Sequence, residues 1–171
     1  MAITKIQSES LNLADTYAFT GTVTGAGGVN TPAFLALGSG SSQSISNVTL
    51  TKVTNLTENL DTDGAYDNAS SRFTVPSGKG GTYYVFFNSR YNTSNDFENI
   101  NMTIYKNGSG GTQIANAQGS AFYYDSFNAS SIVQLSAGDY IEAFTYHNFG
   151  SNKNLAGESI YTYFGGYKII E

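Results

Sequence analysis

The sequence has no cysteine and no tryptophan, only two prolines and a single histidine among its 171 residues. Without cysteine there can be no disulfide framework, no thiolate metal site and no thiol nucleophile. One histidine leaves little room for imidazole chemistry, because metal centres and general acid–base sites commonly use several. These absences weigh against catalysis and against metal binding before any pattern is considered.

Charge is also scarce. Charged residues make up 12% of the chain, and thirteen acidic against eight basic residues give a net charge of -5. Phosphate backbones are bound by clustered Lys and Arg, so we expect no nucleic-acid partner. The start of the chain has no apolar signal core, and no apolar run reaches the roughly 18 residues of a membrane span. We therefore expect a protein that is made without a signal peptide and does not insert into a membrane.

The chain is instead rich in Gly, Tyr and Phe, which number 19, 13 and 11. Aromatic and β-branched residues favour strands, and Gly and Asn favour the turns between them. Short apolar or alternating runs separated by turn residues predict an all-β antiparallel sandwich. We expect strands within Ala33 to Leu37, Val48 to Val53, Arg72 to Val75, Thr82 to Phe87, Ile100 to Tyr105, Ser120 to Tyr124, Ser131 to Leu135, Asp139 to Tyr146 and Ile160 to Ile170.

A glycine-rich break divides the chain into two parts. Gly25-Ala26-Gly27-Gly28 follows a stretch in which Tyr17, Phe19 and Val23 alternate with small polar residues. Such alternation is typical of a strand with one apolar face. We predict an N-terminal anchor strand and linker over residues 1–30 and a main domain over residues 31–171.

Motifs of the main domain resemble the globular domain of complement component 1q and its tumour necrosis factor relatives. The resemblance rests on ordered segments across about 140 residues, including Pro32-Ala33-Phe34-Leu35-Ala36, Ser71-Arg72-Phe73-Thr74-Val75-Pro76, Gly81-Thr82-Tyr83-Tyr84-Val85-Phe86, Ser136-Ala137-Gly138-Asp139-Tyr140-Ile141 and Phe164-Gly165-Gly166-Tyr167-Lys168-Ile169. It implies an antiparallel jelly roll of about ten strands that assembles as a homotrimer.

The aromatic excess gives an independent reason to expect subunit contacts. Adjacent rings in one strand place bulky side chains on both faces of a sheet, and subunit interfaces are enriched in Tyr and Phe. The alternative is that these rings thicken the core or lie on the surface. The predicted interface residues are Tyr83, Tyr84, Phe86, Tyr161, Tyr163 and Phe164.

The first 25 residues resemble leader segments of structural proteins from marine bacteriophages. The resemblance implies a virion protein, either a capsid decoration or a fibre module, held by strand addition to a capsid or tail protein. The predicted anchor residues are Ile3, Ile6, Leu11, Leu13, Tyr17, Phe19 and Val23. Polar loops over residues 91–97 and 148–155 would then face outward, where host surface glycans are candidate partners. The alternative is a free trimeric module that binds carbohydrate or protein.

Two groups of residues are candidates for chemistry. Asp61, Asp63 and Asp67 provide oxygen ligands of the kind calcium uses, but their spacing lacks the later Glu of a calcium loop and favours a solvated turn. His147 lacks a Gly-x-Ser-x-Gly nucleophile partner, and its place at a strand end favours a surface residue. We expect no enzyme activity, no cofactor and no bound metal.

Overall fold

The computed structural model describes residues 30–92, 99–120 and 124–170, and these ranges form thirteen strands without a helix. All strand pairs are antiparallel. No helix long and apolar enough to cross a membrane occurs in the described ranges. The prediction of an all-β antiparallel fold is confirmed.

Two large sheets carry most of the strands. One has the order β10-β7-β13-β1-β4, and its strands are Ser126–Leu135, Gly81–Arg90, Tyr163–Ile170, Ala33–Gly38 and Leu56–Asp61. The other has the order β5-β6-β11-β8-β9, with the strands Tyr66–Asp67, Arg72–Thr74, Tyr140–His147, Asn99–Lys106 and Thr112–Ser120. The short strand β3 (Thr51–Lys52) adds to β11, and β2 (Gln43–Ile45) pairs with β12 (Lys153–Leu155).

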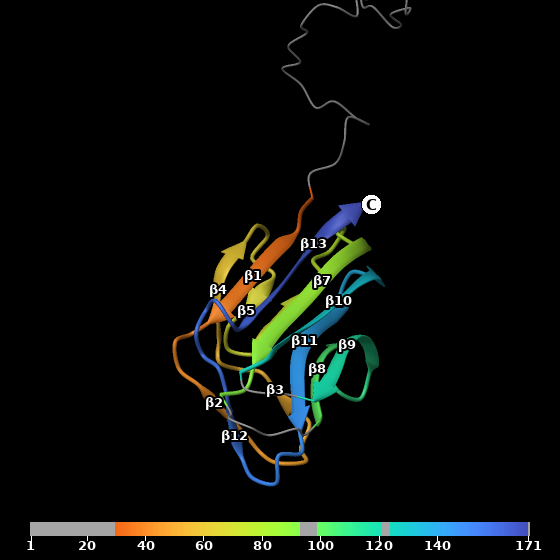
Figure 1. The fold of residues 1–171 in the computed structure, drawn as a ribbon. Helices are drawn as coiled ribbons and strands as arrows, with labels where there is room; N and C mark the ends of the chain where they lie inside the picture. The colour runs from red at the N-terminus through yellow and green to blue at the C-terminus, as the bar shows by residue number, and fades with distance from the viewer. Residues whose placement is uncertain (1–29, 93–98, 121–123, 171) are drawn as a thin grey trace, which may run out of the picture.

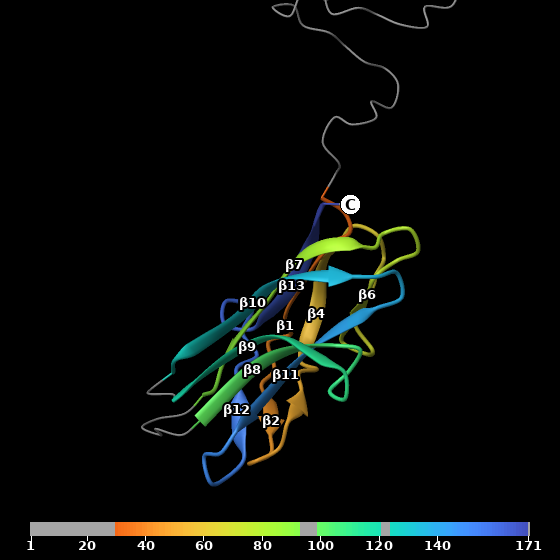
Figure 2. The same cartoon turned by 90° about the vertical axis from the view of Figure 1, so that its right-hand side faces the viewer.

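The core lies between the two sheets, which Figure 2 shows as separate layers. In β7, Tyr83, Val85 and Phe87 are buried while the residues between them are partly exposed, as the period of two in a strand requires. Phe34 of β1 stacks on Phe73 of β6 with ring centroids 4.4 Å apart, so the sheets are joined by direct aromatic contact. This packing is the inter-sheet contact of a jelly-roll sandwich.

Both ends of the described chain lie at the same end of the molecule. The pairing of Ala33 with Tyr167 brings the start of β1 beside the end of β13. Strands β2 and β12 lie at the opposite end (Figure 1). The described chain therefore begins and ends away from the β2–β12 pair (Figure 1).

Most predicted strands are present, but β4, β9 and the short strands β2, β5 and β12 were not predicted. Of the run expected from Ser120 to Tyr124, Ser120 is the last residue of β9, which occupies the polar stretch before it, and residues 121–123 lie outside the described residues. Residues facing inward from β9, such as Ala115 and Gly119, are small. A Cβ on Gly119 would lie 2.5 Å from the Phe127 ring of β10, so the neighbouring strand fills the space that larger side chains would otherwise take. The apolar alternation that marks a strand is consequently absent.

Candidate functional site

The outer face of the five-stranded sheet carries a cluster of aromatic rings from its two central strands. Tyr84 and Phe86 of β7 point away from the core, as do Tyr163 and Tyr167 of β13. Ring centroids are 5.8 Å apart for Tyr84 and Phe86, 5.7 Å for Tyr84 and Tyr167, and 6.1 Å for Phe86 and Tyr163. These separations are typical of interacting aromatic pairs, so the rings form one continuous surface.

Aliphatic side chains extend this surface to the flanking strands. Leu35 of β1 pairs with Leu60 of β4, and Ile132 of β10 pairs with Tyr84. Leu60 is 48% exposed and Ile132 is 66% exposed, which is high for large apolar side chains. We call this surface the aromatic face, comprising Leu35, Leu60, Tyr84, Phe86, Ile132, Tyr163 and Tyr167.

A glycine lets the rings lie close to the sheet. Gly165 stands opposite Phe86 in the pairing of β13 with β7. A Cβ at Gly165 would lie 2.6 Å from the Phe86 ring and 2.9 Å from the carbonyl oxygen of Phe34. The Phe86 ring therefore occupies the space above a residue without a side chain, and the aromatic face is flatter there than it would be with a larger residue.

The structure brings together half of the predicted interface residues. Tyr84, Phe86 and Tyr163 belong to the aromatic face. The prediction of Tyr83 and Phe164 as interface residues is wrong. Their strand positions alternate with those of the outward rings, so both point into the core and are 1% and 0% exposed. Tyr161 precedes β13 and lies under the Arg90 guanidinium, 3.2 Å from its ring centroid.

Sequence reasoning missed the aliphatic part of the aromatic face and Tyr167. In β1, Leu35 and Leu37 alternate with the buried Phe34 and Ala36. This period of two is the sequence signal that would have identified Leu35 as an outward residue. Leu60 gave no comparable signal, because the residues around it in β4 are polar and exposed. Only the strand register places Leu60 beside Leu35.

The predicted anchor residues, Ile3, Ile6, Leu11, Leu13, Tyr17, Phe19 and Val23, lie outside the described residues. So does most of the first predicted contact loop, namely residues 93–97. At the edges of the two predicted loops, Tyr91 and Leu155 were expected to face outward, which is wrong. They pair with one another in a β-bridge and are 1% and 0% exposed. These side chains belong to the core and cannot contact a partner.

The acidic residues of the predicted turn bind the turn itself. Asp61 accepts a hydrogen bond from the backbone N–H of Tyr66 at 2.7 Å, and Asp63 accepts one from the Thr62 hydroxyl at 2.6 Å. The Thr62 hydroxyl holds the pKa of Asp63 below its ordinary value. Asp67 accepts from the backbone N–H of Ala69 at 2.9 Å. Within the described residues, no group of three or more acidic, His or Cys side chains is arranged to hold a metal ion.

His147 is buried, which corrects the expectation of a surface residue. Its Nε2 lies 3.1 Å from the carbonyl oxygen of Ile45, and its Nδ1 accepts a hydrogen bond from the backbone N–H of Phe149 at 3.3 Å. Because Nδ1 accepts, Nε2 carries the proton and donates to Ile45, so the imidazole is neutral. Burial lowers the pKa of His147. Its ring stacks on Phe149 and meets Tyr91 edge on, as a core residue does.

A buried carboxylate on the outer side of the second sheet was also not anticipated. Glu142 of β11 is 5% exposed and lies 2.6 Å from Lys52 Nζ and 3.2 Å from Arg72 Nε. The Arg72 guanidinium also covers the Tyr140 ring at 4.1 Å. The two cations neutralise the carboxylate and join β3, β6 and β11, so this cluster serves the fold.

No protein-family model matches the sequence, and no curated protein matches it. Solved structures do. The Eiger tumour necrosis factor of S. frugiperda has a TM-score of 0.63 at 13% identity, and the match covers 81% of this chain and 92% of the Eiger chain. Murine APRIL has a TM-score of 0.62 at 16% identity, and the match covers 80% of this chain and 98% of APRIL. The globular domain of zebrafish complement 1qA has a TM-score of 0.57 at 17% identity, and the match covers 82% of this chain and 99% of that domain. The chain is therefore an all-β jelly roll with the fold of the tumour necrosis factor and complement component 1q globular domains.

Proposed function

We propose that this protein is a structural component of a bacteriophage virion, a non-enzymatic homotrimer in which the jelly roll faces outward and residues 1–30 form the anchor. The aromatic face is the observation that supports assembly into a trimer. Monomeric proteins rarely leave a broad apolar patch in water, and such patches mark contact surfaces. In a three-fold ring, one patch of each copy contacts a different patch of the next, and an apolar face that extends over several strands can supply one side of such an interface.

The virion role is supported by the resemblance of the first 25 residues to phage leader segments. The described chain begins at Asn30, at the end of the sandwich remote from the β2–β12 pair. An anchor at one end and loops at the other suit a module that stands on a particle. Three copies in one rigid unit would also bind a repetitive surface with avidity, whether that surface is a capsid lattice or a host cell coat.

The virion role is tested on the intact particle that encodes this protein. We expect the protein in the inventory of purified particles and a trimer of this chain on the capsid or tail in high-resolution electron cryomicroscopy. Labelled full-length protein should rebind particles stripped of it, and Phe19→Ser in the predicted anchor should weaken that binding, while Thr20→Ser, which keeps the small polar side, should not. Absence of the protein from the particles would overturn the virion role and leave the trimer to be judged separately.

A second candidate function is a free trimeric module that binds carbohydrate or protein. It is favoured by one specific observation, an uncharged polar groove on the face of the sandwich opposite the aromatic face. Particles that lack the protein, together with a soluble trimer that retains ligand binding, would support this candidate.

A further inference from the structure

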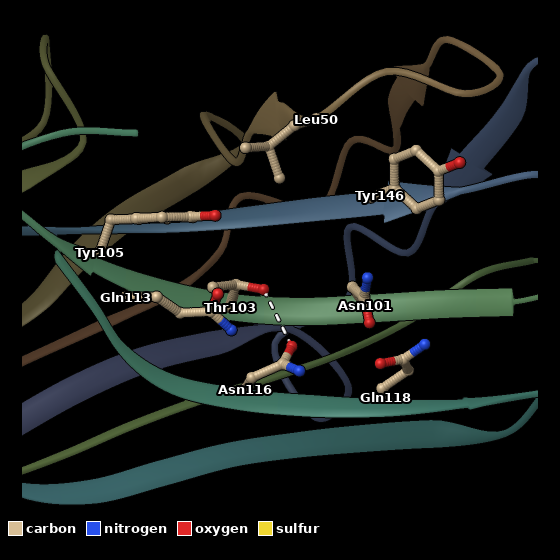
Figure 3. A pocket seen from close by; sticks show the side chains of 8 residues that line it. All are labelled: Leu50, Asn101, Thr103, Tyr105, Gln113, Asn116, Gln118 and Tyr146. Atoms are coloured by element: carbon tan, nitrogen blue, oxygen red, sulfur yellow. Dashed lines mark hydrogen bonds between the residues drawn. The ribbon is translucent and has the colours of Figure 1, made fainter. Parts of the chain in front are cut away.

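A groove of 300 Å³ lies on the outer face of the second large sheet, across β8, β9 and β11. Ligand sites in proteins are concave and span about 300–1,000 Å³, so this one suits a small ligand or one end of a chain. The aromatic face lies on the other sheet, so the groove shares no residue with it. It is lined by Leu50, Asn101, Thr103, Tyr105, Gln113, Asn116, Gln118 and Tyr146 (Figure 3).

The strand register builds the groove from neighbouring outward positions. Asn101 of β8 stands opposite Gln118 of β9 on one side and Tyr146 of β11 on the other. Thr103 stands opposite Asn116, and the Thr103 hydroxyl donates to Asn116 Oδ1 at 3.1 Å. These side chains sit on strands whose inner faces are packed in the core, so their positions are fixed by the sheet.

Two tyrosines mark the ends of the groove. Figure 3 shows Tyr105 and Tyr146 at opposite ends, with the amide side chains along one side and Leu50 on the other. The Tyr105 ring meets Phe144 edge on at 5.3 Å between centroids, which holds it in place. Rigid aromatic rings offer a flat apolar surface with a polar tip and lose little entropy when a ligand binds.

The lining of the groove is polar but carries no charge. None of its eight residues is acidic or basic, whereas four are amides. A carboxamide both donates and accepts hydrogen bonds, as a sugar hydroxyl does, so amides match a polyhydroxyl ligand in either orientation. A phosphate, sulfate or carboxylate would be desolvated here without a counter-charge, which is unfavourable. The lining therefore selects for a neutral ligand.

One acceptor in the groove is unsatisfied. Asn101 Oδ1 is enclosed and accepts no hydrogen bond from the protein. An enclosed acceptor without a donor costs about 1–3 kcal/mol. Rotation about the Asn101 Cβ–Cγ bond exchanges its oxygen and nitrogen, so this amide can turn either an acceptor or a donor towards a ligand hydroxyl.

We propose that this groove binds a neutral oligosaccharide. The apolar faces of its sugar rings pack on Tyr105 and Tyr146, and its hydroxyls exchange hydrogen bonds with the amides of Asn101, Asn116 and Gln118. This inference does not depend on a virion. In a trimer formed through the aromatic face, three such grooves would point outward, and weak single sites would gain avidity on a glycan-coated surface.

The test uses the full-length protein on an array of neutral, sialylated and sulfated oligosaccharides, followed by titration of the best neutral binder by calorimetry. Gln118→Ala removes one exposed amide and should weaken binding about fivefold, the worth of one hydrogen bond. Tyr146→Ala removes a stacking surface and should weaken binding about tenfold or more. Gln134→Ala on β10 is the matched control, because it removes an exposed glutamine from the other sheet and should leave affinity unchanged.

Thermal unfolding of each variant checks that it is folded. If Tyr146→Ala is not folded, the binding of Gln118→Ala alone tests the proposal. Binding of a neutral glycan that both groove variants weaken and the control does not would establish the site. Silence towards all neutral glycans, preference for acidic ones, preference for a peptide, or affinity unchanged by Gln118→Ala and Tyr146→Ala would overturn the proposal.

Discussion

Replacement of Phe86 by Ser should dissociate the proposed trimer without unfolding the subunit. Phe86 points outward and is half-buried in the isolated chain. Burying the rest of its ring in an interface therefore contributes about 1–2 kcal/mol of association free energy per subunit, which is part of the value for burying a fully exposed side chain. Three copies lose about 3–6 kcal/mol, which lowers the association constant roughly 10²- to 10⁴-fold.

Sedimentation equilibrium over a range of concentrations measures this effect. The unaltered protein should sediment at three times the 18.3 kDa mass of the chain, and Phe86→Ser should shift towards the single mass at micromolar concentration. Val48→Ser is the matched control, since Val48 is an apolar side chain 61% exposed outside the aromatic face. An unaltered protein that is monomeric, or a Phe86→Ser variant with the same association constant, would refute the reasoning.

Three further changes have defined outcomes. Gly165→Ala should cost about 1–3 kcal/mol and weaken assembly, because its Cβ displaces the Phe86 ring; calorimetry and sedimentation would detect both, and an unchanged melting temperature would contradict it. Because the pKa of His147 is lowered in the folded protein, its contribution to the free energy of unfolding is complete above pH 6.5, the ordinary pKa, and is lost as the pH falls below that value. Urea unfolding from pH 7.5 to 5 should show this loss of stability, and His147→Gln should reduce the pH dependence. Glu142→Gln should cost about 1–3 kcal/mol in urea unfolding, because it leaves two partly exposed cations without their carboxylate; no loss of stability would contradict that role.

The fold was predictable because its signals are local. Alternation in Gly81 to Phe87 and in Tyr140 to Tyr146 arises from side chains that pack on one core, and the turn residues between such runs limit strand length. Strand β9 escaped prediction for a physical reason. Phe127 reaches from β10 into the space beside Gly119, so β9 needs no large apolar side chain at that position.

The aromatic face was only half predictable. Sequence identified the ring-rich strands, but a pair such as Tyr83 and Tyr84 must divide between core and surface, and only the packed sandwich decides which ring takes which side. The same holds for His147, whose burial follows from the positions of Ile45 and Phe149 around it rather than from its place at the end of a strand.

By itself, the sequence determined the fold class, the absence of thiol chemistry and the surplus of aromatic side chains that one sandwich core does not use. The tertiary structure alone decided which residues form surfaces. The groove is assembled from strands β8, β9 and β11, and Asn101 and Gln118 become neighbours only through strand pairing. Composition and period are properties of the chain, whereas a site is a juxtaposition of distant segments, and the register that creates it is set by the packing of the whole.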